Sequence, residues 1–108
     1  MDAYAVEFGS GTGHVTSDLV TIAGATRAHG IEPSPVMVDR ARSLFAGQPA
    51  LSFATGDARN TGLEADSVDL VLMHTLLCHV PGPEDVLAEA YRVLKPGGTL
   101  AICDGDYD

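Results

Sequence analysis

Residues 6–16 read V-E-F-G-S-G-T-G-H-V-T, and this stretch decides the fold of the chain. An apolar run carries the acid Glu7 near its end, and three glycines follow at every second position, Gly9, Gly11 and Gly13. Because glycine lacks Cβ, the backbone can turn sharply here and approach a ligand, and a helix that follows offers unpaired N–H groups and a positive dipole end. The stretch therefore predicts a strand, a loop and a helix that together hold a nucleotide cofactor.

The spacing of the glycines separates two kinds of cofactor site. A dinucleotide fingerprint, G-x-G-x-x-G, needs its third glycine at the position that His14 occupies, whereas this chain has Gly13. The spacing disfavours a nicotinamide dinucleotide (NAD) domain, which stays as an alternative.

Outward from this stretch, apolar runs alternate with amphipathic ones, as in parallel strands joined by crossover helices. Strands are predicted over residues 4–8, 26–32, 51–55, 67–73 and 99–103. Helices are predicted from Gly13 to Ala23, from Ser34-Pro35 to Phe45, and from Pro83 until Pro96-Gly97-Gly98 stops the third. The sequence thus predicts one α/β domain with a doubly wound, Rossmann-like, mostly parallel sheet.

Each predicted helix has apolar residues at a spacing of about 3.6, which predicts a buried stripe. The three stripes are Val15, Leu19, Ile22 and Ala23; Met37, Ala41, Leu44 and Phe45; and Val86, Leu87, Ala90, Val93 and Leu94.

Composition narrows the class of protein. A chain of 108 residues with 45% hydrophobic residues can bury a core of its own. No run reaches the roughly 18 apolar residues of a membrane span, and no basic region precedes an apolar block at the N-terminus, so we expect a soluble, cytoplasmic protein. The net charge of −9, from 15 acids and 6 bases, disfavours a nucleic acid partner.

No metal site is predicted. Cys78 and Cys103 lack metal-ligand spacing and are expected to be free thiols. Asp104, Asp106 and Asp108 alternate like the start of a calcium loop, but the glycine and the distant glutamate of such a loop are absent. A solvated loop is the better interpretation.

Four further blocks follow the glycine stretch in order: G-I-E-P-S-P at Gly30 to Pro35, G-D-A at Gly56 to Ala58, D-L-V-L-M-H-T-L-L-C-H-V at Asp69 to Val80, and V-L-K-P-G-G at Val93 to Gly98. With G-x-G-x-G preceded by an acid, this series resembles the class I S-adenosylmethionine (SAM) dependent methyltransferases, particularly the branch that modifies small molecules. The resemblance covers nearly the whole chain. It implies SAM as cofactor, a small-molecule acceptor and the strand order 3-2-1-4-5, with ligands at the carboxyl ends of the strands.

The resemblance also assigns roles to two acids and to the loop between them. Glu7 is implied to order the loop and to help hold the amino group of the methionine part through water; the alternative is a strand-terminal acid in solvent. Glu32 is implied to accept hydrogen bonds from both ribose hydroxyls; the alternative is an exposed loop acid. The loop residues implied to line the cofactor are Gly9, Ser10, Gly11 and Gly13.

The adenine end is implied to lie by the third strand. Asp57 is expected to accept from the adenine amino group and the Ala58 backbone N–H to reach a ring nitrogen, with Pro33 and Met37 as apolar faces. The alternative for Asp57 is an Asx-type turn.

Two histidines follow the fourth strand. His74 is expected near the methionine end of the cofactor, mostly through its backbone. His74 and His79 are also candidates for a general base, because imidazole removes protons near neutral pH; the alternative is helix packing.

Complete members of this family add a sixth and a seventh strand after the fifth. The sequence therefore predicts a cofactor-binding core that transfers methyl groups slowly or not at all by itself, and a non-catalytic SAM-binding or assembly module is the alternative. The predicted strand at residues 99–103, T-L-A-I-C, lacks the lysine or proline that blunts a sheet edge, so we expect a homodimer through this edge.

Overall fold

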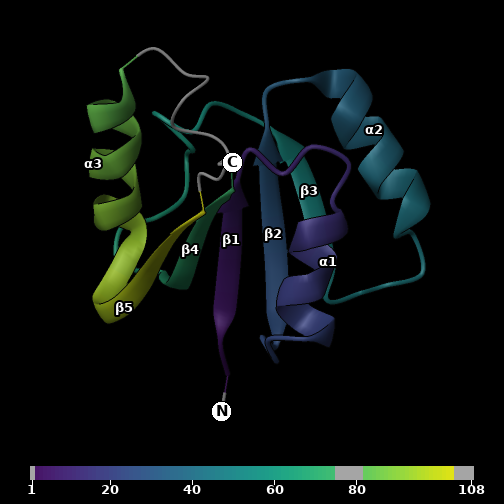
Figure 1. The fold of residues 1–108 in the computed structure, drawn as a ribbon, viewed down its shortest axis with the longest axis horizontal. Coiled ribbons are helices and arrows are strands. Elements are labelled where there is room, and N and C mark those ends of the chain that lie inside the picture. Colours follow the sequence, from purple (N-terminus) through teal and green to yellow (C-terminus); the bar gives the residue numbers. More distant parts are fainter. Residues whose placement is uncertain (1, 75–81, 104–108) are drawn as a thin grey trace.

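The computed structural model describes residues 2–74 and 82–103. Within them the elements are β1 (Tyr4–Phe8), α1 (His14–Thr21), β2 (Arg27–Glu32), α2 (Pro35–Leu44), β3 (Leu51–Thr55), β4 (Val68–His74), α3 (Pro83–Val93) and β5 (Leu94–Cys103) (Figure 1). None of these helices is long and apolar enough to cross a membrane.

The described strands form one parallel sheet with the order β3-β2-β1-β4-β5, which confirms the predicted fold and strand order. The chain therefore reverses its direction of travel across the sheet after β3, between β1 and β4. In an open α/β sheet this is the point at which ligands bind, outside the carboxyl ends of the strands. The glycine loop follows β1 directly and so lies at this point.

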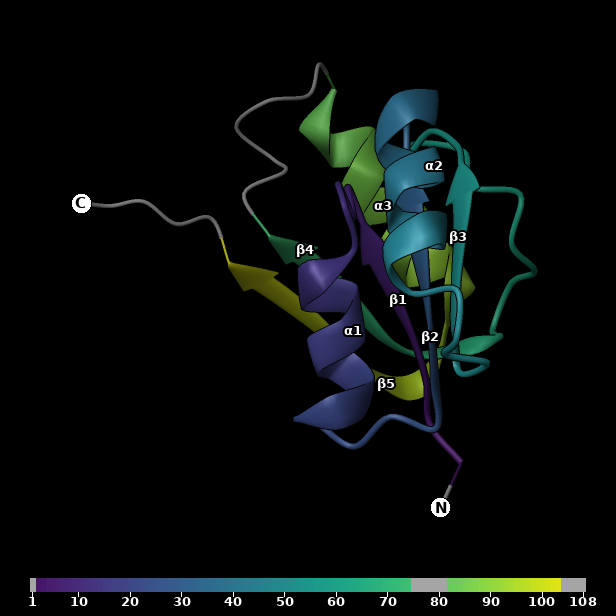
Figure 2. The same ribbon diagram turned by 90° about the vertical axis from the view of Figure 1, so that its right-hand side faces the viewer.

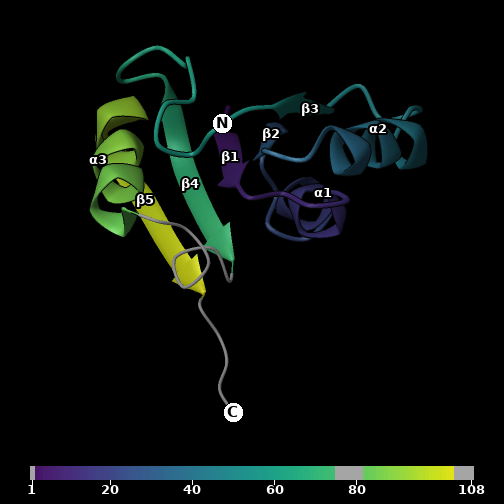
Figure 3. The same ribbon diagram turned by 90° about the horizontal axis from the view of Figure 1, so that it is seen from above.

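Side chains alternate between the two faces of β1, and each face has its own core. Ala5 packs with Leu19 of α1, whereas Val6 and Phe8 pack in the cluster that contains Val86 and other residues of α3. Figure 3 shows α3 beside β4 and β5, with α1 and α2 grouped by β1, β2 and β3, and in Figure 2 α3 lies behind the strands. The sheet thus carries helices on both faces, as a doubly wound fold requires.

Two predicted helix stripes were partly wrong. Ile22 is 79% exposed because α1 ends at Thr21, so the stripe loses its last turn. In α2 the buried residues are Val38 and Ala41, while Met37 and Leu44 face outward. The stripe of α3 was confirmed, because Val86, Ala90, Val93 and Leu94 are buried.

The last strand begins earlier than predicted. Val68 pairs with Leu94 and Leu70 pairs with Thr99, so residues 95–98 form a bulge opposite Asp69. The Asp69 carboxylate accepts the Tyr4 backbone N–H at 2.8 Å and lies 3.3 Å from the Lys95 ammonium, which stabilises this irregular start. Pro96 and Lys95 therefore belong to the strand, whose predicted start at Thr99 was wrong, whereas residues 99–103 lack a lysine or proline as predicted.

Candidate cofactor site

The glycine loop is folded against the end of β2. Gly9, Gly11 and Gly13 have φ values of 80°, 56° and 90°, a region that glycine adopts without strain and that most other residues avoid. The Gly9 and Ser10 backbone N–H groups both donate to the Ile31 carbonyl, at 2.7 and 3.1 Å. The alternating glycines therefore shape a loop that β2 holds in place.

Glu32, the last residue of β2, holds the glycine loop by a hydrogen bond. One of its carboxylate oxygens accepts the Gly11 N–H at 2.8 Å and the other accepts the Ser34 N–H at 3.1 Å. Each carboxylate oxygen offers two lone pairs, so both keep an acceptor site for a ligand. The expected ribose-binding acid is therefore half-buried and positioned by the glycine loop and by the start of α2.

Glu7 is buried, so its solvent-exposed alternative was wrong. The side chain is 2% exposed, and one carboxylate oxygen accepts the Thr16 hydroxyl of α1 at 2.6 Å. Burial raises the pKa of Glu7 to about 7, the Thr16 hydrogen bond opposes this, and the nearby negative charge of Glu32 adds to it. Glu7 thus joins the end of β1 to α1 directly beneath the loop.

Small residues allow the loop to lie this close to the sheet. A Cβ at Gly30 would lie 2.5 Å from the Ser10 hydroxyl, and a Cβ at Gly13 would lie 2.7 Å from the Phe53 ring. The buried Ser10 hydroxyl has no hydrogen-bond partner among residues 2–74 and 82–103. The Ser10 side chain faces β2, so the loop can present its backbone groups, but not this hydroxyl, to a ligand. A Cβ on Gly11 would meet nothing within 4 Å, which leaves open space at the centre of the loop.

Two helix N-termini lie beside the loop. Gly13 caps α1 without any side-chain hydrogen bond, which leaves donors of the first turn available. Ser34 caps α2 as predicted, since its hydroxyl accepts the Met37 N–H at 3.3 Å. Pro33 and Met37, which precede and follow Ser34 in the chain, are both exposed, Met37 to 43%, in keeping with an apolar contact to a ligand.

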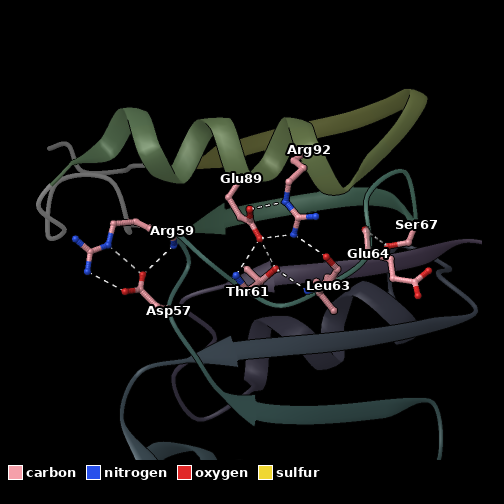
Figure 4. A network of polar contacts seen from close by, with 8 residues as sticks. All are labelled: Asp57, Arg59, Thr61, Leu63, Glu64, Ser67, Glu89 and Arg92. Atoms are coloured by element: carbon pink, nitrogen blue, oxygen red, sulfur yellow. Dashed lines mark hydrogen bonds and ion pairs between the residues drawn. The ribbon is translucent and has the colours of Figure 1, made fainter.

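Asp57 forms the Asx-type turn that was its alternative interpretation. Its carboxylate accepts the Arg59 N–H at 2.8 Å and the Arg59 guanidinium at 3.1 and 2.8 Å (Figure 4). The Arg59 hydrogen bonds hold the pKa of Asp57 at about 2, so this exposed carboxylate is charged. Two carboxylate oxygens with three donors retain one acceptor site for an adenine amino group. Ala58 is half-buried against the core.

A second polar cluster was missed by the sequence analysis. Glu89 of α3 is 7% exposed and accepts from Thr61 and Arg92 (Figure 4). A glutamate next to an apolar helix position is ordinarily solvated, and its partner Thr61 is 28 residues away, so no local pattern predicts it.

The histidine predictions have different outcomes. His74 is exposed at the end of β4, at the carboxyl edge of the sheet where it was expected. His79, the other base candidate, lies outside the described residues, as do Cys78, Asp104, Asp106 and Asp108. Cys103 is a free, exposed cysteine.

The residues that the structure brings together fit SAM. A glycine loop with open space at Gly11 and a helix start without a side-chain cap follow β1 at the reversal point of the sheet, and an acid with one spare acceptor site per oxygen ends the neighbouring strand β2. A cavity of about 250 Å³ lies at the opposite, amino ends of the strands, between Tyr4, Arg27, Asp69 and Lys95, and has no part in this arrangement.

Comparisons with known proteins agree with this geometry. The family described as "Methyltransferase domain" matches residues 6–102. Trans-aconitate 2-methyltransferase of Streptomyces avermitilis is 36% identical over 107 residues, covering 94% of this chain and 39% of that protein. Demethylmenaquinone methyltransferase of Clavibacter sepedonicus is 32% identical over 99 residues, covering 92% and 40%. The chain spans between 27% and 40% of the length of the curated relatives that it matches.

Solved structures share the fold. The protein in complex with the Trm112 methyltransferase activator of Haloferax volcanii superposes with a TM-score of 0.84 at 35% identity, covering 91% of this chain and 43% of that one. The [4+2]-cyclase SpnF superposes with a TM-score of 0.87 at 25% identity, covering 94% and 38%. The family match, the relatives and the site geometry agree with one another, and the chain belongs to the class I SAM-dependent methyltransferases, whose cofactor is SAM.

Proposed function

We propose that this chain binds SAM at the glycine loop and forms the cofactor core of a cytoplasmic methyltransferase that acts on a small molecule. The observation that carries the proposal is the position of Glu32, whose two oxygens hold the Gly11 and Ser34 backbone N–H groups at the end of β2. A carboxylate held in this way accepts hydrogen bonds from two neighbouring ribose hydroxyls without having to be reordered first.

Different residues would contact different parts of the cofactor. Glu32 would accept from the ribose, Asp57 and the Ala58 N–H would contact adenine, Glu7 would face the amino group through water, and His74 would lie by the methionine end. When bound, SAM supplies an electrophilic methyl group on a sulfonium. The residues named here would hold the cofactor side of an in-line transfer, in which alignment of the two reactants and exclusion of water are the main contributions of a protein.

The nature of the acceptor is supported by the relatives. Two of them are named for trans-aconitate and demethylmenaquinone, both small molecules. The fold alone does not fix the reaction, because SpnF is a cyclase on the same fold. Release of S-adenosylhomocysteine with phenols, amines or carboxylic acids would support a small-molecule acceptor. SAM binding without release agrees both with the slow or absent transfer expected of this core by itself and with a non-catalytic module.

Calorimetric titration with SAM, S-adenosylhomocysteine and NAD tests the cofactor. We expect the first two to bind and NAD to give no heat of binding, since His14 occupies the position of the third dinucleotide glycine. Tight binding of NAD, or no binding of SAM by the folded chain, would contradict the proposal.

We further propose self-association through the edge of β5. Pro96 and Lys95 blunt the start of this strand, but residues 99–103 carry no such group, and Ile102 is 43% exposed. The opposite edge differs, because Arg42 donates two hydrogen bonds, at 3.0 and 2.8 Å, to the Phe53 carbonyl of β3.

Light scattering across concentration and salt measures this association. We expect the apparent mass to rise with salt, because screening weakens the repulsion between chains of charge −9. Ile102→Lys is expected to keep the protein monomeric, whereas Leu44→Lys, at an apolar exposed position on α2, leaves association unchanged. A monomer at high concentration and high salt would contradict the proposal.

A further inference from the structure

Glu89 is an unusual residue for the middle of a helix that packs on a sheet. It is 7% exposed, and its neighbours in α3, Val86, Ala90 and Val93, belong to the apolar core. A buried carboxylate is costly unless donors satisfy it. Glu89 therefore needs hydrogen-bond partners, and these are Arg92 of the same helix and Thr61, which lies 28 residues away in the chain.

Four hydrogen bonds converge on this carboxylate. The Thr61 backbone N–H and hydroxyl donate to one oxygen at 2.9 and 2.6 Å, and the Arg92 guanidinium donates to both oxygens, 2.8 Å to each. Arg92 lies one helical turn further along α3, so its planar group meets the carboxylate in the paired geometry that arginine favours.

Arg92 extends the contact along the same segment. Its guanidinium also donates to the Leu63 carbonyl at 2.6 Å, while the Leu63 N–H donates to the Thr61 hydroxyl at 3.2 Å. Figure 4 shows the side chains of Glu89 and Arg92 pointing from α3 onto the segment that carries Thr61 and Leu63. Glu89 and Arg92 thus hold this segment by hydrogen bonds at two residues, Thr61 and Leu63.

The segment that Glu89 and Arg92 hold comprises residues 56–63, which follow β3 and contain no helix or strand. We call it the post-β3 segment. Besides the α3 contacts, it is ordered by the Asp57–Arg59 pair, by the Asn60 N–H that donates to the Asp57 carbonyl at 2.9 Å, and by burial of Ala58 and Leu63 against the core. Asp57 and Ala58 are the residues assigned to adenine above, four and three positions before Thr61.

Glu89 keeps its negative charge at neutral pH and in mild acid. Hydrogen bonds from Arg92, and then from Thr61, hold the pKa of Glu89 at about 2. The carboxylate is therefore ionised at neutral pH, and its grip on Thr61 persists in mild acid.

We propose that Glu89 and Arg92 are positioning residues for adenine recognition, acting through Thr61 and Leu63 to fix where Asp57 and Ala58 meet the base. This inference rests on the proposed SAM site. Because the post-β3 segment is ordered before the ligand binds, less entropy is lost on binding. The order also keeps the Asp57 carboxylate, an acceptor, where it can meet the amino group of adenine and disfavour a base that carries a carbonyl oxygen there.

The test compares S-adenosylhomocysteine with S-inosylhomocysteine, which carries a carbonyl where adenine has its amino group. Wild type is expected to prefer the adenine compound. In Glu89→Gln the negative charge is lost and an NH2 group replaces one of the two oxygens that accept from Arg92. We expect the affinity for the adenine compound to fall about ten-fold, with a smaller loss for the inosine compound, so that the preference for adenine decreases. Glu89→Asp is expected to retain only part of the preference for adenine, because its shorter side chain cannot accept all four hydrogen bonds.

Two further variants keep the test decisive. Glu84→Gln changes an exposed acid in the first turn of the same helix and is expected to leave both affinities unchanged. Thr61→Val removes one of the four hydrogen bonds to Glu89 and the acceptor of the Leu63 N–H, and it keeps the ion pair between Glu89 and Arg92. This variant decides the question if Glu89→Gln does not fold.

The outcomes separate the two proposals. A folded wild type that binds neither compound contradicts the SAM site itself. A wild type that prefers adenine, with folded Glu89→Gln and Thr61→Val variants that lose affinity equally for both compounds or for neither, overturns the positioning role and leaves the SAM site standing.

Discussion

Glu32→Ala is expected to weaken SAM binding by about 3 kcal/mol, which corresponds to roughly a hundred-fold rise in Kd. The substitution removes the two acceptors for the ribose hydroxyls and also releases the Gly11 and Ser34 backbone N–H groups, which lie 2.8 and 3.1 Å from the carboxylate. Hydrogen bonds to a charged group contribute about 1.5–3 kcal/mol each, so the loss exceeds that of a surface contact. Calorimetric titration of both proteins measures the difference.

Two matched variants isolate the cause. Glu32→Gln keeps one oxygen for Gly11 or Ser34 and is expected to lose less affinity than the alanine variant. Glu64→Ala removes an exposed acid and is expected to bind SAM like wild type, which controls for the change in net charge. Unchanged SAM affinity in folded Glu32→Ala would remove Glu32 from the site.

The strands were predictable because burial on both faces gives apolar runs that few other structures produce. The predicted bounds of β1 and β3 were confirmed, those of β2 differ by one residue at its start, and those of β4 differ by one residue at each end. The start of β5 was not predictable, because Pro96-Gly97-Gly98 ordinarily interrupts a strand, and only the pairing of Leu94 with Val68 places it in the sheet.

The loop side of the site was predictable because local chemistry encodes it. Positive φ values require the glycines, and Ser34 before Pro35 marks the start of α2. The same local chemistry explains Asp57, whose partner Arg59 stands two residues away and draws the carboxylate into a turn.

The contacts between distant elements were not predictable from spacing. Glu89 looks like a solvated helix position in the sequence, and only the fold shows that Thr61 lies beside it. Glu7 is similar, because its burial depends on where α1 crosses the end of β1 and places Thr16 against the carboxylate.

The second large effect is expected in the pH dependence of stability, with Glu7 as its source. Burial raises the pKa of this carboxyl from its ordinary value of 4.5 to about 7 in the folded protein. Between these two values the folded state binds more protons than the unfolded state, so the free energy of unfolding falls as the pH rises. The difference between the two pKa values corresponds to about 3 kcal/mol, present below pH ~4.5 and lost by pH ~7.

His29 acts in the opposite direction and must be separated from Glu7. Burial, with the nearby charges of Arg27 and Arg42, lowers its pKa from 6.5, so its contribution to the free energy of unfolding rises with pH. A wild-type profile alone therefore mixes two opposing slopes. At each pH, the difference in free energy of unfolding between wild type and a variant that lacks only the Glu7 titration does not contain the contribution of His29.

Glu7→Gln is that variant, since its amide keeps the size of the side chain and an oxygen that can accept the Thr16 hydroxyl. Urea unfolding at pH 5, 6, 7 and 8 is expected to show the variant gaining stability relative to wild type as the pH rises, because only wild type must then bury a charged group. Glu64→Gln, at an exposed position, is expected to follow the wild-type profile throughout. Equal pH profiles for Glu7→Gln and wild type would mean that Glu7 is ionised in the folded protein at pH 5 as it is in water, and that the Thr16 hydroxyl alone compensates for its burial.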